Sequence, residues 1–231
     1  MQLSFTRAWL PVIMAALSAS VAAQNAALAE RFENKVREYE AQDRASPPPR
    51  GAILFAGDSQ FYRWKTIHED LPGYTLINRG IDSFQFRDLL NYADRIVTPY
   101  APQLIVLHVG GNDVHNGRTP AEVLEGFKTF VGLVRAKLPD VPVVFSSITP
   151  GPGRWDEAVP RQKANQLVKE YVARHPDLRF IDLWDAMLTA DGQPREELWV
   201  EDRVHPNHAG YLIRVERTRP LLGAPDSVSA R

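Results

Sequence analysis

One stretch of the sequence decides the fold, Ala52-Ile53-Leu54-Phe55-Ala56-Gly57-Asp58-Ser59-Gln60. Its run from Ala52 to Ala56 is continuously apolar, which is typical of a strand buried on both faces of a parallel sheet. Gly57 permits a tight turn directly after the strand, because glycine tolerates backbone conformations that other residues avoid. Ser59 would then begin a helix at the carboxyl end of the strand. Ligands of open parallel sheets bind at this edge, so the stretch predicts both a sheet and the place of a site.

Further apolar runs predict the other strands of the sheet, Tyr74–Asn78, Gln103–Val109, Val141–Ser147 and Leu178–Asp182. The helices expected between and after them are Pro120–Leu138, Arg161–Arg174 and a last one from near His208 to Arg219. The first is the most clearly marked, because Thr119 suits an N-cap and Glu122 completes a capping box with it. Strands that alternate with helices predict an α/β fold, in which helices cover both faces of a parallel sheet.

Polar residues that come after the predicted strands form four motifs. These are Gly57-Asp58-Ser59-Gln60, Asn78-Arg79-Gly80, Gly110-Gly111-Asn112-Asp113 and Asp202-Arg203-Val204-His205-Pro206. The carboxyl ends of parallel strands meet at one edge, so these motifs can converge although they lie far apart in the sequence. Taken singly, each motif also has a plain interpretation as a turn, a loop or a local ion pair. Their occurrence together, in this order, favours a hydrolytic site.

Ester hydrolysis without a metal needs a nucleophile, a base, a group that orients the base and donors for the developing oxyanion. Ser59 is placed to be the nucleophile, and the N-terminus of its helix favours negative charge. His205 is the candidate base, and Asp202 is the candidate partner for one of its ring nitrogens. The backbone N–H groups of Ser59 and Gly80, together with the side-chain amide of Asn112, are the expected oxyanion donors.

These motifs resemble those of the SGNH hydrolase superfamily, also called GDSL-type esterases and lipases. The resemblance runs from about Gly51 to Leu221. It implies a flavodoxin-like three-layer αβα sandwich with a five-stranded parallel sheet of order 2-1-3-4-5. It also implies that Ser59 attacks, that Asp202 orients His205, and that Ser59, Gly80 and Asn112 form the oxyanion hole. Two departures stand out: Gln60 replaces an aliphatic residue of many members, and Ile81-Asp82-Ser83 follows Gly80 where many members have a second glycine.

The function expected from this resemblance is that of a serine esterase, which forms an acyl-enzyme on Ser59 and acts on short-chain acyl or acetyl esters, including those of carbohydrates. Four further residues are candidates to line the substrate site, Asp82, His115, Arg154 and Trp155. No cofactor and no metal are expected. A lysophospholipase or thioesterase of the same fold, or a non-catalytic envelope protein that binds carbohydrate, are the alternatives. A metallophosphoesterase is disfavoured, because the sequence lacks the Asn-His-Glu or Asn-His-Asp triplet of such sites.

The N-terminus predicts an export signal. Arg7 is the only charge in Met1–Ala23, an apolar run follows it, and Val21-Ala22-Ala23 fits the small residues before a cleavage site. The alternative is an uncleaved anchor, but Pro11 interrupts the run and the run is shorter than the roughly 20 residues that span a bilayer. We therefore expect a periplasmic or secreted protein without a stable transmembrane anchor.

After that signal, we expect a helix and Pro-rich linker over residues 24–50, a hydrolase domain over 51–222 and a tail over 223–231. The composition of the 231 residues excludes several classes of function. The chain has no cysteine, which excludes disulfides, thiolate nucleophiles and cysteine-ligated metals. Its 27 basic and 28 acidic residues give a formal charge of -1, so nucleic acid is not an expected partner.

Overall fold

The computed structural model describes residues 30–225, which fall into two units divided after Ala45. In the first unit, residues 30–45 form a helix, as expected for this part of the chain. The predicted signal segment Met1–Ala23, residues 24–29 of the expected helix and residues 226–231 of the expected tail lie outside the described residues. Export therefore stays a prediction. None of the helices within residues 30–225 combines the length and the apolar character that crossing a bilayer requires.

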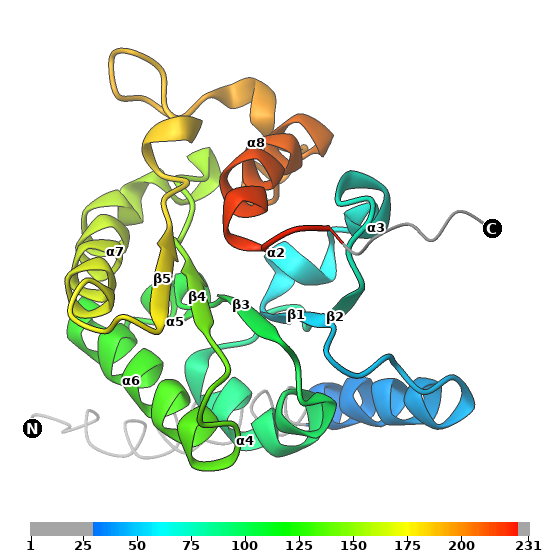
Figure 1. Cartoon of the computed structure of the whole chain (residues 1–231). Helices are drawn as coiled ribbons and strands as arrows, with labels where there is room; N and C mark the ends of the chain where they lie inside the picture. Colours follow the sequence, from blue (N-terminus) through cyan, green and yellow to red (C-terminus); the bar gives the residue numbers. More distant parts are fainter. Residues whose placement is uncertain (1–29, 226–231) are drawn as a thin grey trace, which may run out of the picture. The chain divides into compact units, whose positions relative to one another are not determined.

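The second unit, Ser46–Arg231, is built on a five-stranded sheet whose strands are all parallel. The strands are β1 (Ile53–Gly57), β2 (Leu76–Gly80), β3 (Leu104–His108), β4 (Val143–Ser146) and β5 (Leu178–Ile181). Their order is β2-β1-β3-β4-β5, which confirms the expected topology (Figure 1). The observed ends differ from the expected ones by at most two residues, and β1 continues through Gly57 because this residue pairs in register with Gly80 of β2 and His108 of β3.

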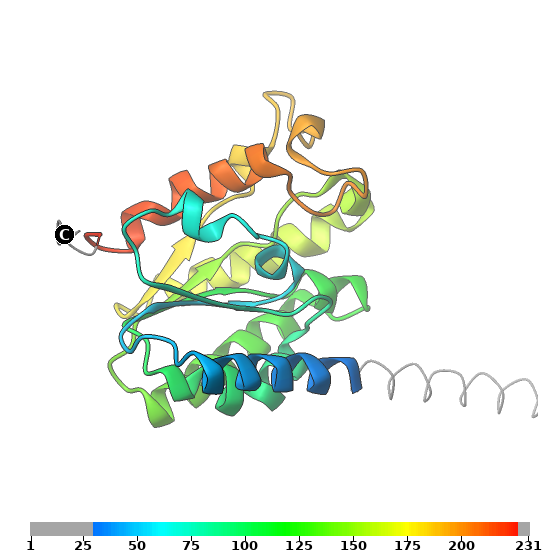
Figure 2. The same ribbon diagram turned by 90° about the vertical axis from the view of Figure 1, so that its right-hand side faces the viewer.

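Helices cover both faces of the sheet, which confirms the three-layer αβα architecture. They are α2 (Ser59–Tyr62), α3 (Ile67–Asp70), α4 (Phe86–Ile96), α5 (Gly111–His115), α6 (Pro120–Lys137), α7 (Ala158–Val172) and α8 (His208–Thr218). The two views of the ribbon place α8 with α2 and α3 on one face, and α4 and α6 on the other (Figures 1 and 2). Helix α7 begins three residues before the expected Arg161, because the chain enters it directly from a 3₁₀ segment, η2 (Pro152–Glu157).

The local sequence explains why α6 begins where it does. The Glu122 backbone N–H donates to Thr119 Oγ1 at 3.2 Å, and the Thr119 backbone N–H donates to the Glu122 carboxylate at 2.7 Å. This is the predicted capping box, with Pro120 at the first helical position. The apolar stripe of the helix is buried, and Phe127 meets Phe145 of β4 edge to face at a ring distance of 5.1 Å.

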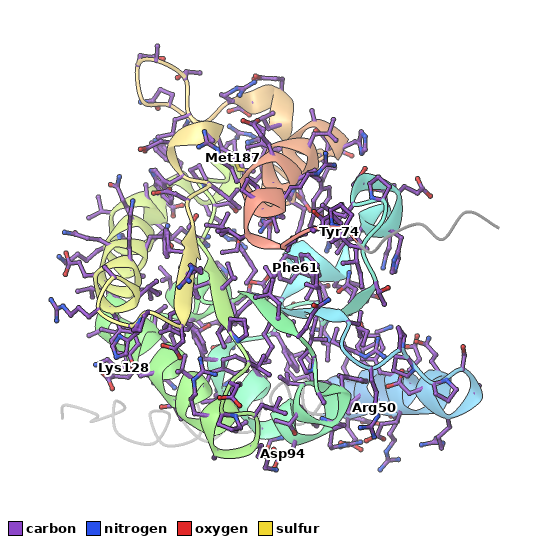
Figure 3. The ribbon with its side chains drawn as sticks, in the orientation of Figure 1. Arg50, Phe61, Tyr74, Asp94, Lys128 and Met187 are labelled. Carbon is purple, nitrogen blue, oxygen red and sulfur yellow. The ribbon has the colours of Figure 1, made fainter. Side chains whose placement is uncertain are left out.

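On the opposite face, aromatic side chains fix the short helix α2 between the sheet and α8. Phe61 meets Phe55 of β1 edge to face at 5.3 Å, and Trp64 stacks on Tyr211 of α8 at 5.2 Å. Phe61 and Met187, both labelled in Figure 3, belong to the same buried cluster. Such ring pairs add about 0.5–1.5 kcal/mol each beyond the area they bury. The turn that carries Ser59 therefore rests on a rigid base.

Candidate active site

Ser59 lies on a turn that only glycine can make at its first position. Gly57 has φ +144°, and a Cβ at this position would lie 1.8 Å from the carbonyl oxygen of His108. Asp58 caps α2, because its carboxylate accepts the Gln60 backbone N–H at 3.0 Å. The turn therefore directs the Ser59 side chain to the carboxyl edge of the sheet.

The structure brings Ser59 together with His205 and Asp202 from the other end of the domain. His205 Nε2 is 2.9 Å from Ser59 Oγ, and His205 Nδ1 is 2.6 Å from Asp202 Oδ2. A carboxylate can only accept, so Nδ1 carries the proton and Nε2 of the neutral ring is left to accept from the Ser59 hydroxyl. This is the arrangement that a serine nucleophile and its base require.

Asp202 is fixed by its own loop. Burial opposes ionisation of its carboxyl group, but hydrogen bonds from the His205 backbone, the His205 ring and the Val204 backbone outweigh this and lower the pKa of Asp202 to about 2. Arg63 adds a cation, with Nη1 at 3.3 Å from Asp202 Oδ2. Asp202 therefore stays ionised over the whole neutral range and holds the ring of His205 in one orientation.

The expectation that Gly80 supplies an oxyanion donor is wrong. Its backbone N–H donates to the Asn78 side chain at 2.9 Å, and the residue does not line the pocket at Ser59. The absence of a side chain at Gly80 serves packing instead, because a Cβ would lie 2.2 Å from the Tyr62 backbone nitrogen in α2. Glycine here lets β2 approach the nucleophile helix.

Ser83 is better placed than Gly80 to donate a hydrogen bond into the pocket. It lines the pocket beside Ser59, and it has φ +66°, a left-handed conformation that is uncommon for a residue with a side chain. Within residues 30–225, the structure shows no hydrogen-bond acceptor for the backbone N–H of Ser83 or for that of Ser59. Asn112 also lines the pocket, and its amide donates one proton to the Phe84 carbonyl at 3.0 Å, which leaves the second proton available.

The pocket around these groups has a volume of about 330 Å³ and a mainly polar lining. Asp82 and Arg154 line it, as expected. His115 and Trp155 do not line it, and this expectation is corrected: the His115 ring is held 2.5 Å from Glu157, and Trp155 stacks on Trp184 at 6.1 Å. The lining residues that were not anticipated from the sequence include Arg63, Ser83 and Arg161.

A buried polar network joins the nucleophile turn to the loop of His205. Gln60, which directly follows Ser59, donates from its side chain to the Val204 carbonyl at 3.1 Å, next to His205. Its side-chain oxygen accepts from Arg214 of α8 at 3.1 Å. Arg214 is fully buried, and burial lowers the pKa of its guanidinium to about 10. Among the described residues, no carboxylate lies within ion-pair distance of Arg214, so Gln60 and Ser146 Oγ are its acceptors.

The loop after β4 packs backbone to backbone against the loop of Asp202 and His205. The Gly153 N–H donates to the Arg203 carbonyl at 2.8 Å. A Cβ at Gly153 would lie 2.9 Å from the Asp202 carbonyl oxygen, and one at Gly151 would lie 3.2 Å from that of Arg203. One wall of the pocket is therefore joined directly to the acid–base loop.

Nothing in residues 30–225 groups three or more histidine, aspartate or glutamate side chains in the way a bound metal ion requires. Asp113 and His115 have the Asp-x-His spacing of some metal sites, but both are engaged elsewhere. The Asp113 carboxylate accepts the Phe86 backbone N–H at 3.1 Å, and His115 pairs with Glu157. The side chains of this pair are therefore committed to other contacts.

The fold and the rim of the sheet define an ester hydrolase of the SGNH type. The chain belongs to the GDSL-like lipase/acylhydrolase family, whose model matches residues 43–213. Among curated proteins, the alpha1 subunit of platelet-activating factor acetylhydrolase IB from Pongo abelii is 30% identical over an alignment of 182 residues that covers 74% of each chain. The subunit of the same name from Bos taurus is 29% identical over the same length and shares.

Solved structures show the same fold. A chain from Streptococcus pneumoniae has a TM-score of 0.76 at 24% identity, and the match covers 89% of this chain and 99% of that one. A GDSL-like lipase from Bacteroides thetaiotaomicron has a TM-score of 0.69 at 21% identity, with 83% and 98% covered. At these identities, the similarity concerns the fold.

Proposed function

We propose that this hydrolase is a serine esterase that cleaves short-chain acyl esters, above all acetyl esters, through an acyl-enzyme on Ser59. The observation that carries the proposal is the contact chain from Ser59 Oγ to His205 Nε2 at 2.9 Å and from His205 Nδ1 to Asp202 at 2.6 Å. These three side chains supply a nucleophile, a base and an orienting carboxylate, and the mechanism needs no further group for these roles.

In the proposed reaction, Ser59 Oγ attacks the ester carbonyl carbon while its proton passes to His205 Nε2. The carbonyl oxygen becomes an oxyanion, which accepts from the backbone N–H groups of Ser59 and Ser83 and from the Asn112 amide. The intermediate collapses, and the alcohol leaves with the proton from His205. Water then attacks the acyl-enzyme with His205 again as base, which releases the acid and restores the Ser59 hydroxyl.

Two findings support a small acyl group. The pocket of about 330 Å³ has a mainly polar lining, which offers little apolar surface to a long alkyl chain. The curated relative from Pongo abelii is named an acetylhydrolase, and it covers most of this chain. The polar lining also suits a hydroxylated alcohol such as a sugar.

The test is a panel of esters of graded acyl length, including acetylated sugars, assayed with wild type and Ser59→Ala. We expect turnover to be greatest with acetyl esters and to fall by about 10⁴-fold or more in Ser59→Ala. Circular dichroism of the variant checks that the fold is intact. A folded Ser59→Ala protein with wild-type turnover would refute the serine mechanism. Turnover that rises with chain length would indicate the lysophospholipase or thioesterase alternative.

A further inference from the structure

Two arginines reach the pocket from the segment that follows β4 and leads into α7. Arg161 comes from the first half of α7, and Arg154 comes from η2, which leads into that helix. Both line the same pocket as Ser59 and Asn112. The proposed mechanism uses neither of them.

Arg161 is a guanidinium held in a fixed position. Its side chain is buried, with the residue only 7% exposed, and both Nε and Nη2 donate to Glu157 Oε2 at 2.9 and 2.7 Å. Nη2 also donates to the Gly111 carbonyl at 3.2 Å. A Cβ at Gly111 would come within 3.2 Å of Nη1, so glycine at this position leaves room around the guanidinium. Ordering a buried arginine in this way costs conformational freedom and desolvation, which a role in binding would explain.

One nitrogen of this fixed group is unused. Nη1 of Arg161 has no acceptor among residues 30–225, and it is not among the enclosed polar atoms that lack a partner there. Solvent or a ligand in the pocket can therefore reach it. Nη1 is a preorganised donor, because Nε and Nη2 of the same planar guanidinium are already hydrogen-bonded to Glu157 and Gly111.

Arg154 adds a second cation, and unlike Arg161 it has no carboxylate partner among the described residues. Within the described part of the chain, the only hydrogen bond of its side chain goes to the adjacent Gly153 carbonyl at 3.4 Å, and no ion pair is formed there. The acidic residues that line the pocket are engaged by other partners: Asp58 by His108, Asp82 by Arg63, and Asp202 by His205. Arg161 is paired with Glu157, so the positive charge on this wall that no carboxylate among the described residues neutralises is that of Arg154.

We propose that Arg154 and Arg161 bind an anionic group, a carboxylate or a phosphate, on the alcohol part of the ester. The inference rests on the proposed function, since it places the small acyl group at Ser59 and the alcohol against the arginine wall. Guanidinium groups bind both anions through paired, charge-assisted hydrogen bonds. A pocket of about 330 Å³ is small for a ligand site, so the anion and the ester belong to one compact molecule such as an acetylated acidic sugar.

The test compares three sugars acetylated at the same hydroxyl: glucose, glucuronic acid and glucose 6-phosphate. The first is neutral, the second adds a carboxylate and the third adds a phosphate, so the arms separate the two anions. We expect kcat/KM for at least one acidic ester to exceed that for the neutral ester by about 10-fold or more, as charge-assisted hydrogen bonds allow. Equal values for all three esters would overturn the inference and leave the proposed function standing.

The variant Arg154→Gln tests the same point on the protein. We expect it to lower kcat/KM for the acidic ester, chiefly through KM, by about 10-fold more than it lowers kcat/KM for the neutral ester. Arg217→Gln is the matched control, because Arg217 is exposed on α8 and its loss changes the net charge equally outside the pocket. An equal effect of both variants would refute the inference, since it would indicate general attraction by net charge.

Arg161→Lys removes the planar group but keeps a charge, and circular dichroism and thermal unfolding establish whether it folds. Calorimetry with the Ser59→Ala protein supplies a readout that does not need turnover. Binding of the acidic acetyl sugars that is lost in Ser59→Ala/Arg154→Gln supports the inference, even if wild type fails to cleave them and the proposed function falls. Binding of neutral and acidic sugars with one affinity overturns it.

Discussion

Gln60 offers a test of how the nucleophile turn and the acid–base loop are held together. Its side chain accepts from the buried Arg214 and donates to the Val204 carbonyl, which directly precedes His205. Gln60→Leu removes both bonds with little change in side-chain volume. Gln60→Glu keeps an acceptor for Arg214 but loses the donor to Val204. The pair of variants therefore separates the two contacts.

The expected magnitudes follow from burial. In Gln60→Leu, Arg214 Nη2 loses its acceptor in a position where the whole residue is 0% exposed. An unsatisfied buried donor costs about 1–3 kcal/mol, and more for a charged group, so we expect the free energy of unfolding to fall by about 2–4 kcal/mol. In Gln60→Glu, a carboxylate faces Arg214 and this free energy should be kept. Its loss of the Val204 anchor should lower kcat by about 10-fold, because small displacements of a base are costly.

Urea unfolding followed by tryptophan fluorescence measures stability, and acetyl ester hydrolysis measures kcat and KM. We expect Gln60→Leu to fall in both stability and kcat, and Gln60→Glu to fall in kcat with KM unchanged. A Gln60→Leu protein as stable as wild type would show that water satisfies Arg214. A Gln60→Glu protein with wild-type kcat would show that the Val204 contact does not position His205.

The remaining predictions concern the rim and the buried acid next to it. Asn112→Ala should lower kcat by about 10²–10³-fold with little change in KM, and a change in KM alone would make Asn112 a substrate contact. Burial raises the pKa of Asp113 to about 7 against the opposing hydrogen bond from Phe86, so its contribution to stability is present at low pH and is lost as the pH rises through about 7. Asp113→Asn should therefore have a higher melting temperature than wild type at about pH 8, and this difference should disappear near pH 4. An equal difference in melting temperature at both pH values would contradict the raised pKa of Asp113. Gly57→Ala should prevent folding or lower stability by more than about 3 kcal/mol, because its Cβ meets the His108 carbonyl, and a soluble, wild-type-like melting curve would refute this. Activity should survive exhaustive dialysis against a chelator, and recovery only on adding zinc or manganese would point to a metal hydrolase.

The sheet could be predicted because buried parallel strands appear as plain apolar runs, and the strand order followed from the resemblance of four motifs. The contact of Ser59 with His205 and Asp202 could be predicted for the same reason, since residues that follow parallel strands share an edge. The exact ends of the strands could not be predicted, because pairing with the neighbouring strands sets them. Gly57 is an example, since its pairing with Gly80 and His108 extends β1 by one residue.

The oxyanion donors and the pocket wall could not be predicted in the same way. Whether a backbone N–H faces the pocket depends on local dihedral angles, and Ser83 reaches a positive φ that its residue type does not suggest. His115 and Trp155 lie close in sequence to pocket residues, but Glu157 and Trp184 hold them elsewhere. Arg161 was expected only as the start of a helix, and the contact that fixes it comes from Glu157 in the preceding 3₁₀ segment.

The close packing of Gly151 and Gly153 on the loop of Asp202 and His205 sets a rule for re-engineering substrate choice. A loop graft from a relative that replaced residues 149–154 alone would bring side chains or altered dihedral angles against the carbonyls of Asp202 and Arg203. The two loops therefore form one transplantable module, and a chimera should exchange both together. A mutagenic library aimed at specificity should keep both glycines fixed and vary Arg154. The Arg154 side chain lines the pocket and is not part of the packing of Gly151 and Gly153 on the other loop.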